Sequence, residues 1–268
     1  MNSLQDQVVV ITGASRGFGL AMASEFQRVG AHVVLSSRDE VAVQQAIAKL
    51  PTPANAFGVK CDVRDLTQVE QLARAAVSRF GKIDVWINNA GVAHRYAKFL
   101  EIDPPDWRAS IETNLIGAYH GCRVALAQML SRRAGQIINI LGMGADRPAP
   151  NQTGYGASKA ALMRLTESLA QEYADSGVRI CALRPGMMWT DMLAGAEGVQ
   201  TPELQKRMEW AMRVFGNPPS LPAQFLVRLL ERGVTNGKSY QVVTPTMFVP
   251  RMVGEMLGAG KRNPRPWE

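Results

Sequence analysis

The stretch that most constrains the fold lies at the start of the chain. Residues 7–12 form a short, apolar, β-branched run, which is typical of a strand buried on both faces of a parallel sheet. A glycine-rich turn containing Gly13, Gly17 and Gly19 follows directly, and an amphipathic segment then continues to about Val29. Glycines let the backbone approach a pyrophosphate closely, and the following helix offers free N–H groups and a positive dipole end. Strand, turn and helix in this order therefore predict a dinucleotide-binding fold.

Strand and helix patterns alternate along the rest of the chain. This alternation predicts an α/β fold of the Rossmann type, a doubly wound parallel sheet of about seven strands with helices on both faces. We expect residues 1–268 to form one dinucleotide-binding and catalytic domain, with ligands at the carboxyl ends of the strands. Further strands are predicted over 32–37, 56–61, 82–87, 136–141, 178–183 and 241–244, and helices over about 39–50, 66–80, 104–132 and 154–175.

Composition narrows the classes of function. The chain is 46% hydrophobic, but no apolar run approaches the roughly 20 residues that span a bilayer, and no signal peptide is evident. We therefore expect a cytoplasmic protein without a membrane span. Three single cysteines and three dispersed histidines predict reduced thiols and no metal site. The net charge is +7, but apart from residues 261–265 the basic residues are spread along the chain, so we expect no nucleic-acid partner.

A candidate proton-transfer pair lies in the predicted helix at 154–175. Tyr155 and Lys159 are four residues apart, so they share one face of that helix. A free tyrosine has a pKa of about 10, and a neighbouring ammonium group favours the phenolate and lowers that pKa. The pair could therefore exchange a proton with an alcohol or a ketone near neutral pH. The same spacing also describes an exposed tyrosine beside a solvated lysine.

The end of the second predicted strand bears on the type of cofactor. An acidic residue there would bind the ribose 2′-hydroxyl of NAD, but this chain has Ser37 followed by Arg38. Arg16, in the glycine-rich turn, would lie on the same side. Two guanidinium groups suit a 2′-phosphate, which they can bind bidentately. We therefore predict NADP(H) as the cofactor; the alternative is that both arginines are merely solvated.

Together these motifs resemble the classical short-chain dehydrogenase/reductase family. The resemblance covers about residues 5 to 190, and the motifs stand in the order found in that family. They are Thr12-Gly13-x-x-x-Gly17-x-Gly19, Asp62, Asn88-Asn89-Ala90-Gly91, Asn114, Tyr155-x-x-x-Lys159, and Pro185-Gly186 with Thr190.

The resemblance implies an oxidoreductase that interconverts a secondary alcohol and a ketone. It implies that Tyr155 is the general acid/base, and that Lys159 lowers the pKa of that tyrosine and hydrogen-bonds the nicotinamide ribose. Asn114 would hold a water molecule in a proton relay behind the lysine. It also implies a homodimer or homotetramer that associates through the helices at about 106–132 and 154–175.

The resemblance further implies where the cofactor binds. The glycine turn would hold the pyrophosphate, and Asp62 with Val63 would face the adenine. Asn89 and the backbone after it would line the adenosine side, and residues 185–190 would cover the nicotinamide. The implied cofactor-binding residues are Gly13, Ser15, Arg16, Gly17, Phe18, Gly19, Ser37, Arg38, Asp62, Val63, Asn89, Ala90, Gly91, Tyr155, Lys159, Pro185, Gly186 and Thr190.

One catalytic position departs from the family pattern. The family places a serine about thirteen residues before the tyrosine, where its hydroxyl helps hold the substrate oxygen; this chain has Gly142. Another group, such as a substrate hydroxyl or a backbone N–H near Gly142, could replace that serine. Alternatively the glycine makes room for a bulky substrate. A third reading is a cofactor-binding protein that has lost hydride transfer and serves as a scaffold or regulator.

The carboxyl-terminal third carries the predicted substrate contacts. The segment at about 192–217 is predicted to be a lid, and its methionines and aromatic residues suit a fairly large, mostly apolar substrate, although they could instead pack the lid on the core. The atypical tail at about 245–268 could cover a neighbouring subunit or the site mouth, or be loosely ordered. The candidate substrate-contacting residues are Gly142, Met143, Met187 and Met192.

Overall fold

The strands of the protein form one parallel sheet in the order β3-β2-β1-β4-β5-β6-β7. The structure is a computed structural model that describes residues 3–189, 202–243 and 245–256. The predicted Rossmann-type doubly wound fold is confirmed. The strands are β1 (Val8–Thr12), β2 (His32–Ser37), β3 (Ala56–Lys60), β4 (Val85–Asn88), β5 (Gly135–Ile140), β6 (Val178–Arg184) and β7 (Ser239–Gln241).

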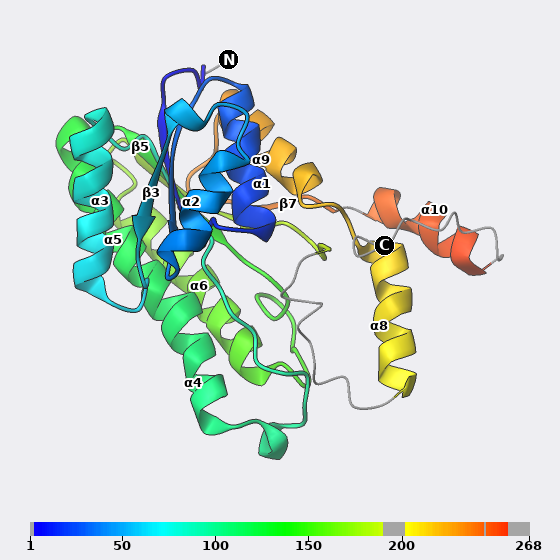
Figure 1. Cartoon of the computed structure of the whole chain (residues 1–268). Helices are drawn as coiled ribbons and strands as arrows, with labels where there is room; N and C mark the ends of the chain where they lie inside the picture. The colour runs from blue at the N-terminus through cyan, green and yellow to red at the C-terminus, as the bar shows by residue number, and fades with distance from the viewer. Residues whose placement is uncertain (1–2, 190–201, 244, 257–268) are drawn as a thin grey trace.

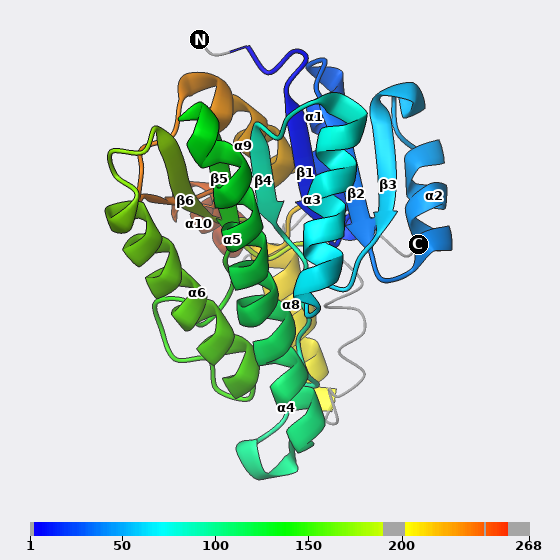
Figure 2. The same ribbon diagram turned by 90° about the vertical axis from the view of Figure 1, so that its left-hand side faces the viewer.

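Helices cover both faces of this sheet (Figures 1 and 2). One face carries α3, α5 and α6, and the other carries α1, α2 and α9. The helices are α1 (Gly17–Arg28), α2 (Glu40–Ala48), α3 (Leu66–Phe80), α4 (Pro104–Ile111), α5 (Gly117–Met129), α6 (Thr153–Glu172), α8 (Pro202–Phe215), α9 (Ser220–Arg232) and α10 (Pro245–Met256).

Each face of the sheet has its own apolar core, and β1 contributes to both. Successive residues of a strand point to opposite faces. Val9 and Ile11 accordingly pack in the core beneath α1 and α9, whereas Val8 and Val10 pack in the core beneath α3 and α5. All residues of β1 are buried, as its β-branched apolar sequence predicts. Burial on both faces leaves the ends of the strands to offer polar groups to a ligand, and in doubly wound sheets ligands bind at the carboxyl ends.

Several elements differ from the predicted pattern. The last strand is Ser239–Gln241 rather than 241–244, because residues 239–241 pair with the end of β6, while Val242 is buried in the core beyond. Helix α9 was not predicted; Pro222 lies in its first turn, where the missing N–H would have no intrahelical partner. Within the predicted tail, residues 245–256 form helix α10.

The predicted long helix at 104–132 is divided in two. A π-helical turn, Glu112–Ile116, joins α4 to α5 and gives one turn a wider, five-residue hydrogen-bonding pattern. Within the ranges described, no helix is both long enough and apolar enough to cross a bilayer.

Candidate active site

The glycine-rich turn forms a tight cradle between β1 and α1. Gly13 and Gly17 have φ angles of +63° and +56°, a region that favours glycine. A Cβ atom on Gly19 would lie 2.5 Å from the carbonyl oxygen of Gly13, so a side chain would fill the cradle. Helix α1 begins at Gly17 with no side-chain cap and no acidic residue in its first turn. These residues fit a dinucleotide pyrophosphate, which would accept hydrogen bonds from the free N–H groups.

The end of β4 holds this cradle in place. The side-chain amide of Asn89 donates hydrogen bonds to the carbonyl oxygens of Thr12 and Gly13, at 2.9 and 3.0 Å. The Thr12 hydroxyl accepts the backbone N–H groups of Asn89 and Ala90, both at 3.0 Å. Asn89 therefore braces the turn with its side chain. The Phe18 side chain is buried in the core, so this predicted cofactor residue offers the cradle only its backbone.

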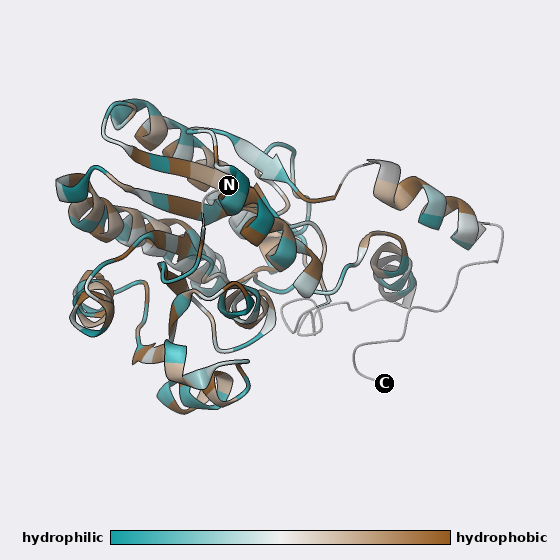
Figure 3. Ribbon diagram, turned by 90° about the horizontal axis from the view of Figure 1, so that it is seen from above, coloured by the Kyte–Doolittle hydropathy of each residue, from teal (hydrophilic) through white to brown (hydrophobic). Residues whose placement is uncertain are grey.

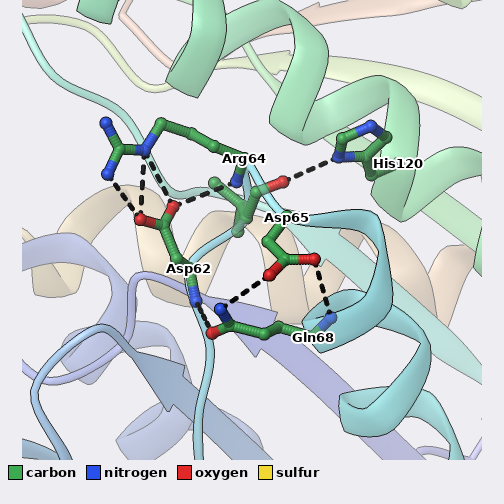
Figure 4. Close-up of polar contacts among 6 residues, drawn as sticks. Asp62, Arg64, Asp65, Gln68 and His120 are labelled. Atoms are coloured by element: carbon green, nitrogen blue, oxygen red, sulfur yellow. Dashed lines mark hydrogen bonds and ion pairs between the residues drawn. The ribbon is translucent and has the colours of Figure 1, made fainter.

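Asp62, after β3, is held by an arginine that the sequence motifs do not include. The Arg64 guanidinium donates to both carboxylate oxygens of Asp62 at 2.6–3.0 Å (Figure 4). The hydrogen bonds from Arg64, with a further contribution from the positive charge of Arg38, hold the pKa of Asp62 below its usual value. No local sequence pattern could have shown this pairing, because it depends on how the chain turns after the strand.

Val63, the neighbour of Asp62, is directed toward α5. Its carbonyl oxygen accepts a hydrogen bond from Nδ1 of His120 at 2.9 Å (Figure 4). A Cβ atom on Gly117 would lie 2.5 Å from the Val63 side chain, so the two elements are in close contact. The predicted contact of Val63 with adenine stays a prediction.

A cavity of about 210 Å³ opens beside the ion pair and is lined by three arginines, Arg38, Arg64 and Arg95. The three come from the ends of β2 and β3 and from the loop after β4. Guanidinium groups in this number suit a phosphate-bearing ligand. Arg16 is exposed at the N-cap of α1. The other residues that line the cavity are Val92, Ala93, His94, Asp106, Ala109 and Thr113.

Helix α6 brings Tyr155 and Lys159 to the carboxyl end of β5. Lys159 is buried, and its ammonium group donates a hydrogen bond to the carbonyl oxygen of Ile140 at 2.8 Å. The Lys159 Nζ atom lies 5.6 Å from the centroid of the Tyr155 ring. The loss of hydration on burial lowers the pKa of Lys159 to about 8.

The pKa of Tyr155 moves in the direction opposite to the sequence prediction. Burial raises it to about 12. The residue is half-buried, and its hydroxyl lies against Gly142 at the end of β5. The loss of hydration outweighs the attraction of an ammonium group whose hydrogen bond goes to a backbone carbonyl. In this structure the tyrosine is therefore protonated at neutral pH.

Asn114 lies in the π-helical turn, a kind of turn often found at functional sites. Its side chain accepts the Val92 N–H at 2.8 Å and donates to the Val92 carbonyl oxygen at 2.9 Å and to the Ser158 hydroxyl at 3.0 Å. Ser158 in turn donates to the backbone carbonyl of Tyr155 at 2.6 Å. This chain of bonds joins α6 to the loop after β4, and the predicted water relay stays a prediction.

Gly142 follows β5 and faces the tyrosine. A Cβ atom at this position would lie 2.0 Å from the Tyr155 hydroxyl oxygen and 2.8 Å from the ring carbon that bears it. The tyrosine hydroxyl therefore occupies the space that a larger residue at 142 would need. Met143 is 53% exposed beside it, and Met187 is partly buried. Two other predicted contacts, Thr190 and Met192, lie outside the described residues.

The segment after β6 is joined to the predicted lid. Gly186 has a φ of +84°, and the buried Pro185 precedes it. The Asn217 N–H donates to the Met187 carbonyl at 3.1 Å, and the Trp189 N–H donates to the Asn217 carbonyl at 3.2 Å. The described part of the lid, α8 with Asn217, is thus linked to the segment predicted to cover a nicotinamide.

A glycine cradle at the switch point of a parallel sheet, with a tyrosine–lysine pair at a neighbouring strand end, defines a class of dinucleotide-binding oxidoreductase. A family model for short chain dehydrogenases matches residues 7–199. This chain belongs to the short-chain dehydrogenase/reductase family.

Relatives and similar solved structures include a hydroxysteroid dehydrogenase, a polyketide ketoreductase and a 3-ketoacyl-(acyl-carrier-protein) reductase. The chain is 36% identical over 214 residues to 3beta-hydroxysteroid dehydrogenase 1 of Eggerthella lenta, covering 78% of this chain and 80% of the relative. A variant of actinorhodin polyketide ketoreductase with NADPH has a similar structure, with a TM-score of 0.81, 28% identity, and 90% and 97% of the two chains covered. The 3-ketoacyl-(acyl-carrier-protein) reductase of Brucella melitensis with NADH gives a TM-score of 0.79, 27% identity, and coverage of 90% and 98%.

Proposed function

We propose that this protein is an NADP(H)-dependent oxidoreductase that interconverts a secondary alcohol and a ketone on a fairly large, mostly apolar substrate. The observation that carries the proposal is the placement of the Tyr155 hydroxyl and the buried Lys159 ammonium together at the end of β5, on the same edge of the sheet as the glycine cradle. We also infer a single catalytic domain, since the described strands all join one sheet.

The residues of this chain support proton transfer to a carbonyl oxygen. When bound, a nicotinamide cofactor would supply or accept the hydride at the reacting carbon. The cradle between β1 and α1 would hold its pyrophosphate, and Lys159 would bind its ribose. Tyr155, protonated at neutral pH, would donate a hydrogen bond and then its proton to the substrate oxygen. The Lys159 ammonium would stabilise the phenolate that this transfer leaves.

The preference for NADP(H) rests on the charge of the chain after β2. Similar structures contain NADPH in one case and NADH in another, so likeness alone does not decide the cofactor. Here Ser37 and Arg38 end the strand where an acidic residue would select NAD(H). Arg64 adds a guanidinium group that lines the same cavity as Arg38, and it pairs with the Asp62 carboxylate. Positive charge there favours a 2′-phosphate.

The apolar character of the proposed substrate rests on the residues around the tyrosine. Met143 is exposed, and Met187, Met188 and Trp189 lie partly exposed after β6. Methionine side chains adapt to irregular apolar ligands. The likeness to a steroid dehydrogenase and a polyketide ketoreductase supports a substrate of comparable size.

The proposal is tested by following absorbance at 340 nm with NADPH and with NADH. The ketones would be a 3-ketosteroid, a bicyclic ketone and, as a small control, acetone. We expect turnover of the larger ketones with a preference for NADPH. Tyr155→Phe should lose at least about 100-fold in kcat, because it removes the proton donor. Arg38→Ala should weaken NADPH binding by about 10-fold and leave NADH binding nearly unchanged.

Three results would contradict parts of this proposal. Full activity of Tyr155→Phe would remove the tyrosine from the mechanism. Equal affinity of the unmutated protein for the two cofactors would contradict the role of the arginines. Tight NADPH binding without turnover of any ketone would instead favour a cofactor-binding scaffold, a function that the glycine at position 142 first suggested.

A further inference from the structure

The loop after β5 and the first turn of α6 touch at three glycines. Besides the contact between Gly142 and Tyr155, a Cβ atom on Gly144 would lie 2.3 Å from the Cα atom of Gly156. Gly144 has a φ of +94°, which itself favours glycine. A Cβ atom on Gly156 would lie 2.7 Å from the Cβ atom of Ala149. The loop is therefore in direct contact with the helix at the residue that follows the tyrosine.

We propose that Gly142 is a positioning residue for Tyr155. Because Gly142 has no side chain, the Tyr155 hydroxyl can occupy the place where a Cβ atom of residue 142 would be. The tyrosine would then hold the reacting oxygen without a second side chain from the end of β5. The glycine is then required in this protein, and a serine added at 142 would compete with the tyrosine for one place. The chemical part of this inference rests on the proposed function, whereas the packing part does not.

Contacts before and after the tyrosine anchor helix α6. Gly154, one residue before the tyrosine, lies against the Trp107 indole, which a Cβ atom would approach to 2.8 Å. The same turn is anchored by the hydrogen bond from the Gly154 N–H to Nε2 of His94 at 3.2 Å. The Lys159 bond to the Ile140 carbonyl anchors the helix one turn further on.

The ring of the tyrosine is the part that can yield. A Cβ atom at 142 would meet the hydroxyl and the adjoining ring atoms, which form the far end of that side chain. An alanine or serine at 142 should therefore leave the fold intact and turn the hydroxyl away from the strand end. A displacement of about 1 Å at a reacting group can cost about 100-fold in rate.

The packing part is tested by a double-mutant cycle read by thermal unfolding, which needs no substrate. The four proteins are the unmutated chain, Gly142→Ala, Tyr155→Phe and the double variant. We expect Gly142→Ala to lower the Tm clearly when Tyr155 is present and less when phenylalanine replaces it, because the 2.0 Å contact involves the hydroxyl oxygen. Gly254→Ala in α10, where a Cβ atom would have no neighbour within 4 Å, is the matched control.

The chemical part is tested by measuring turnover and cofactor binding separately. Gly142→Ala and Gly142→Ser should each lower kcat by about 100-fold while the Kd for NADPH changes less than about twofold. Serine should be no better than alanine. The Gly254→Ala control should match the unmutated protein in both quantities.

Clear results would overturn the inference. An equal loss in Tm in the Tyr155 and phenylalanine backgrounds would show that the hydroxyl contact is not what excludes a side chain. A higher kcat for Gly142→Ser would show that the position is open to a helping hydroxyl. If Gly142→Ala fails to fold, the double variant should regain folding, and its failure would also overturn the inference. If none of these proteins turns over any ketone, the proposed function is contradicted, and the thermal-unfolding cycle still tests the packing part of the inference.

Discussion

Burial sets the charge states of the two residues proposed to transfer the proton. It lowers the pKa of Lys159 to about 8 and raises that of Tyr155 to about 12, so both are protonated at neutral pH. A protonated phenol donates to a carbonyl oxygen, and a neighbouring cation stabilises the phenolate that remains. Before any ligand binds, the two residues are thus in the charge states that the proposed ketone reduction needs.

The pKa of Lys159 leads to a prediction about pH. Below about pH 8 the amine is charged, and above it the charge is lost, so the forming phenolate on Tyr155 loses its stabilising neighbour. The kcat for ketone reduction should therefore fall as the pH rises through about 8. The measurement is kcat at saturating ketone and NADPH between pH 6 and 10. Lys159→Arg keeps its charge across this range, so its residual activity should lack that fall.

A rate that stays level or rises between pH 8 and 10 in the unmutated protein would contradict this prediction. So would the same fall in Lys159→Arg, because the titrating group would then be another one.

Some site residues could be predicted from the sequence and others could not. The cradle glycines and the spacing of Tyr155 and Lys159 are local patterns, so they can be seen without a fold. The ion pair of Arg64 with Asp62, and the approach of Gly142 to the Tyr155 hydroxyl, depend on loop geometry and on contacts between separate elements. The pKa of Tyr155 could not be predicted either, since it depends on how much water the fold removes.

Helix α10 is attached to the described part of the predicted lid. The rings of Phe248 and Phe215 are 5.1 Å apart at their centroids, and Arg213 pairs with Glu255 at 3.0 Å. Seen from above in Figure 3, α8 and α10 lie beside each other at one side of the molecule. Part of the predicted tail therefore braces α8.

Arg251, in α10, contacts Asn217, the last residue of the predicted lid, and this contact leads to a second prediction. Its guanidinium donates to the Asn217 side-chain oxygen at 3.1 Å, and Asn217 is fully buried and paired with residues 187–189. Arg251→Ala should raise the KM for a large ketone by about 3- to 10-fold and lower the free energy of unfolding by about 1 kcal/mol, with kcat little changed. Steady-state kinetics and urea unfolding measure these changes.

The matched control for this prediction is Arg228→Ala, which removes an exposed arginine from α9. Arg228→Ala should change neither the KM for the ketone nor the free energy of unfolding. An Arg251→Ala protein with unchanged KM and unchanged stability would show that α10 does not brace the lid.

At the level of elements, periodicity predicted the parallel strands and most of the helices. It could not place β7, because the β-branched residues of the predicted strand are at 242–244, beyond the three residues that pair with β6. It also missed the π-helical turn, since one wider turn hardly disturbs an apolar pattern. Helix α9 was missed because its first turn follows two prolines and contains a third.

The whole molecule presents an apolar surface on α5 that bears on its association. Ile116, the last residue of the π-helical turn, and Tyr119, in the first turn of α5, are 40% and 44% exposed. Isolated exposed apolar residues are ordinary, but these lie on one of the helices through which the family resemblance implies dimers or tetramers. The oligomeric state stays a prediction.

A charge placed on this surface should separate the subunits. We expect the unmutated protein to elute as a dimer or tetramer, and Tyr119→Glu to shift it to smaller species, because an unpaired carboxylate would be buried at the interface. Size-exclusion chromatography with light scattering measures the mass. Val41→Glu, which charges an equally isolated apolar residue on α2, is the control and should change nothing. A monomeric unmutated protein, or dissociation by both variants, would contradict the prediction.

The π-helical turn also restricts how this chain can vary in length. A π-helical turn holds one residue more than an α-helical turn, so loss of one residue from 112–116 would convert it to an ordinary α-helical turn without rotating α5 relative to α4. Gly117 and Gly121 would keep their close neighbours, whereas Asn114 would lose the turn from which it bonds Val92. A deletion here should therefore spare the helices and disturb the site, where variation can proceed only by substitution.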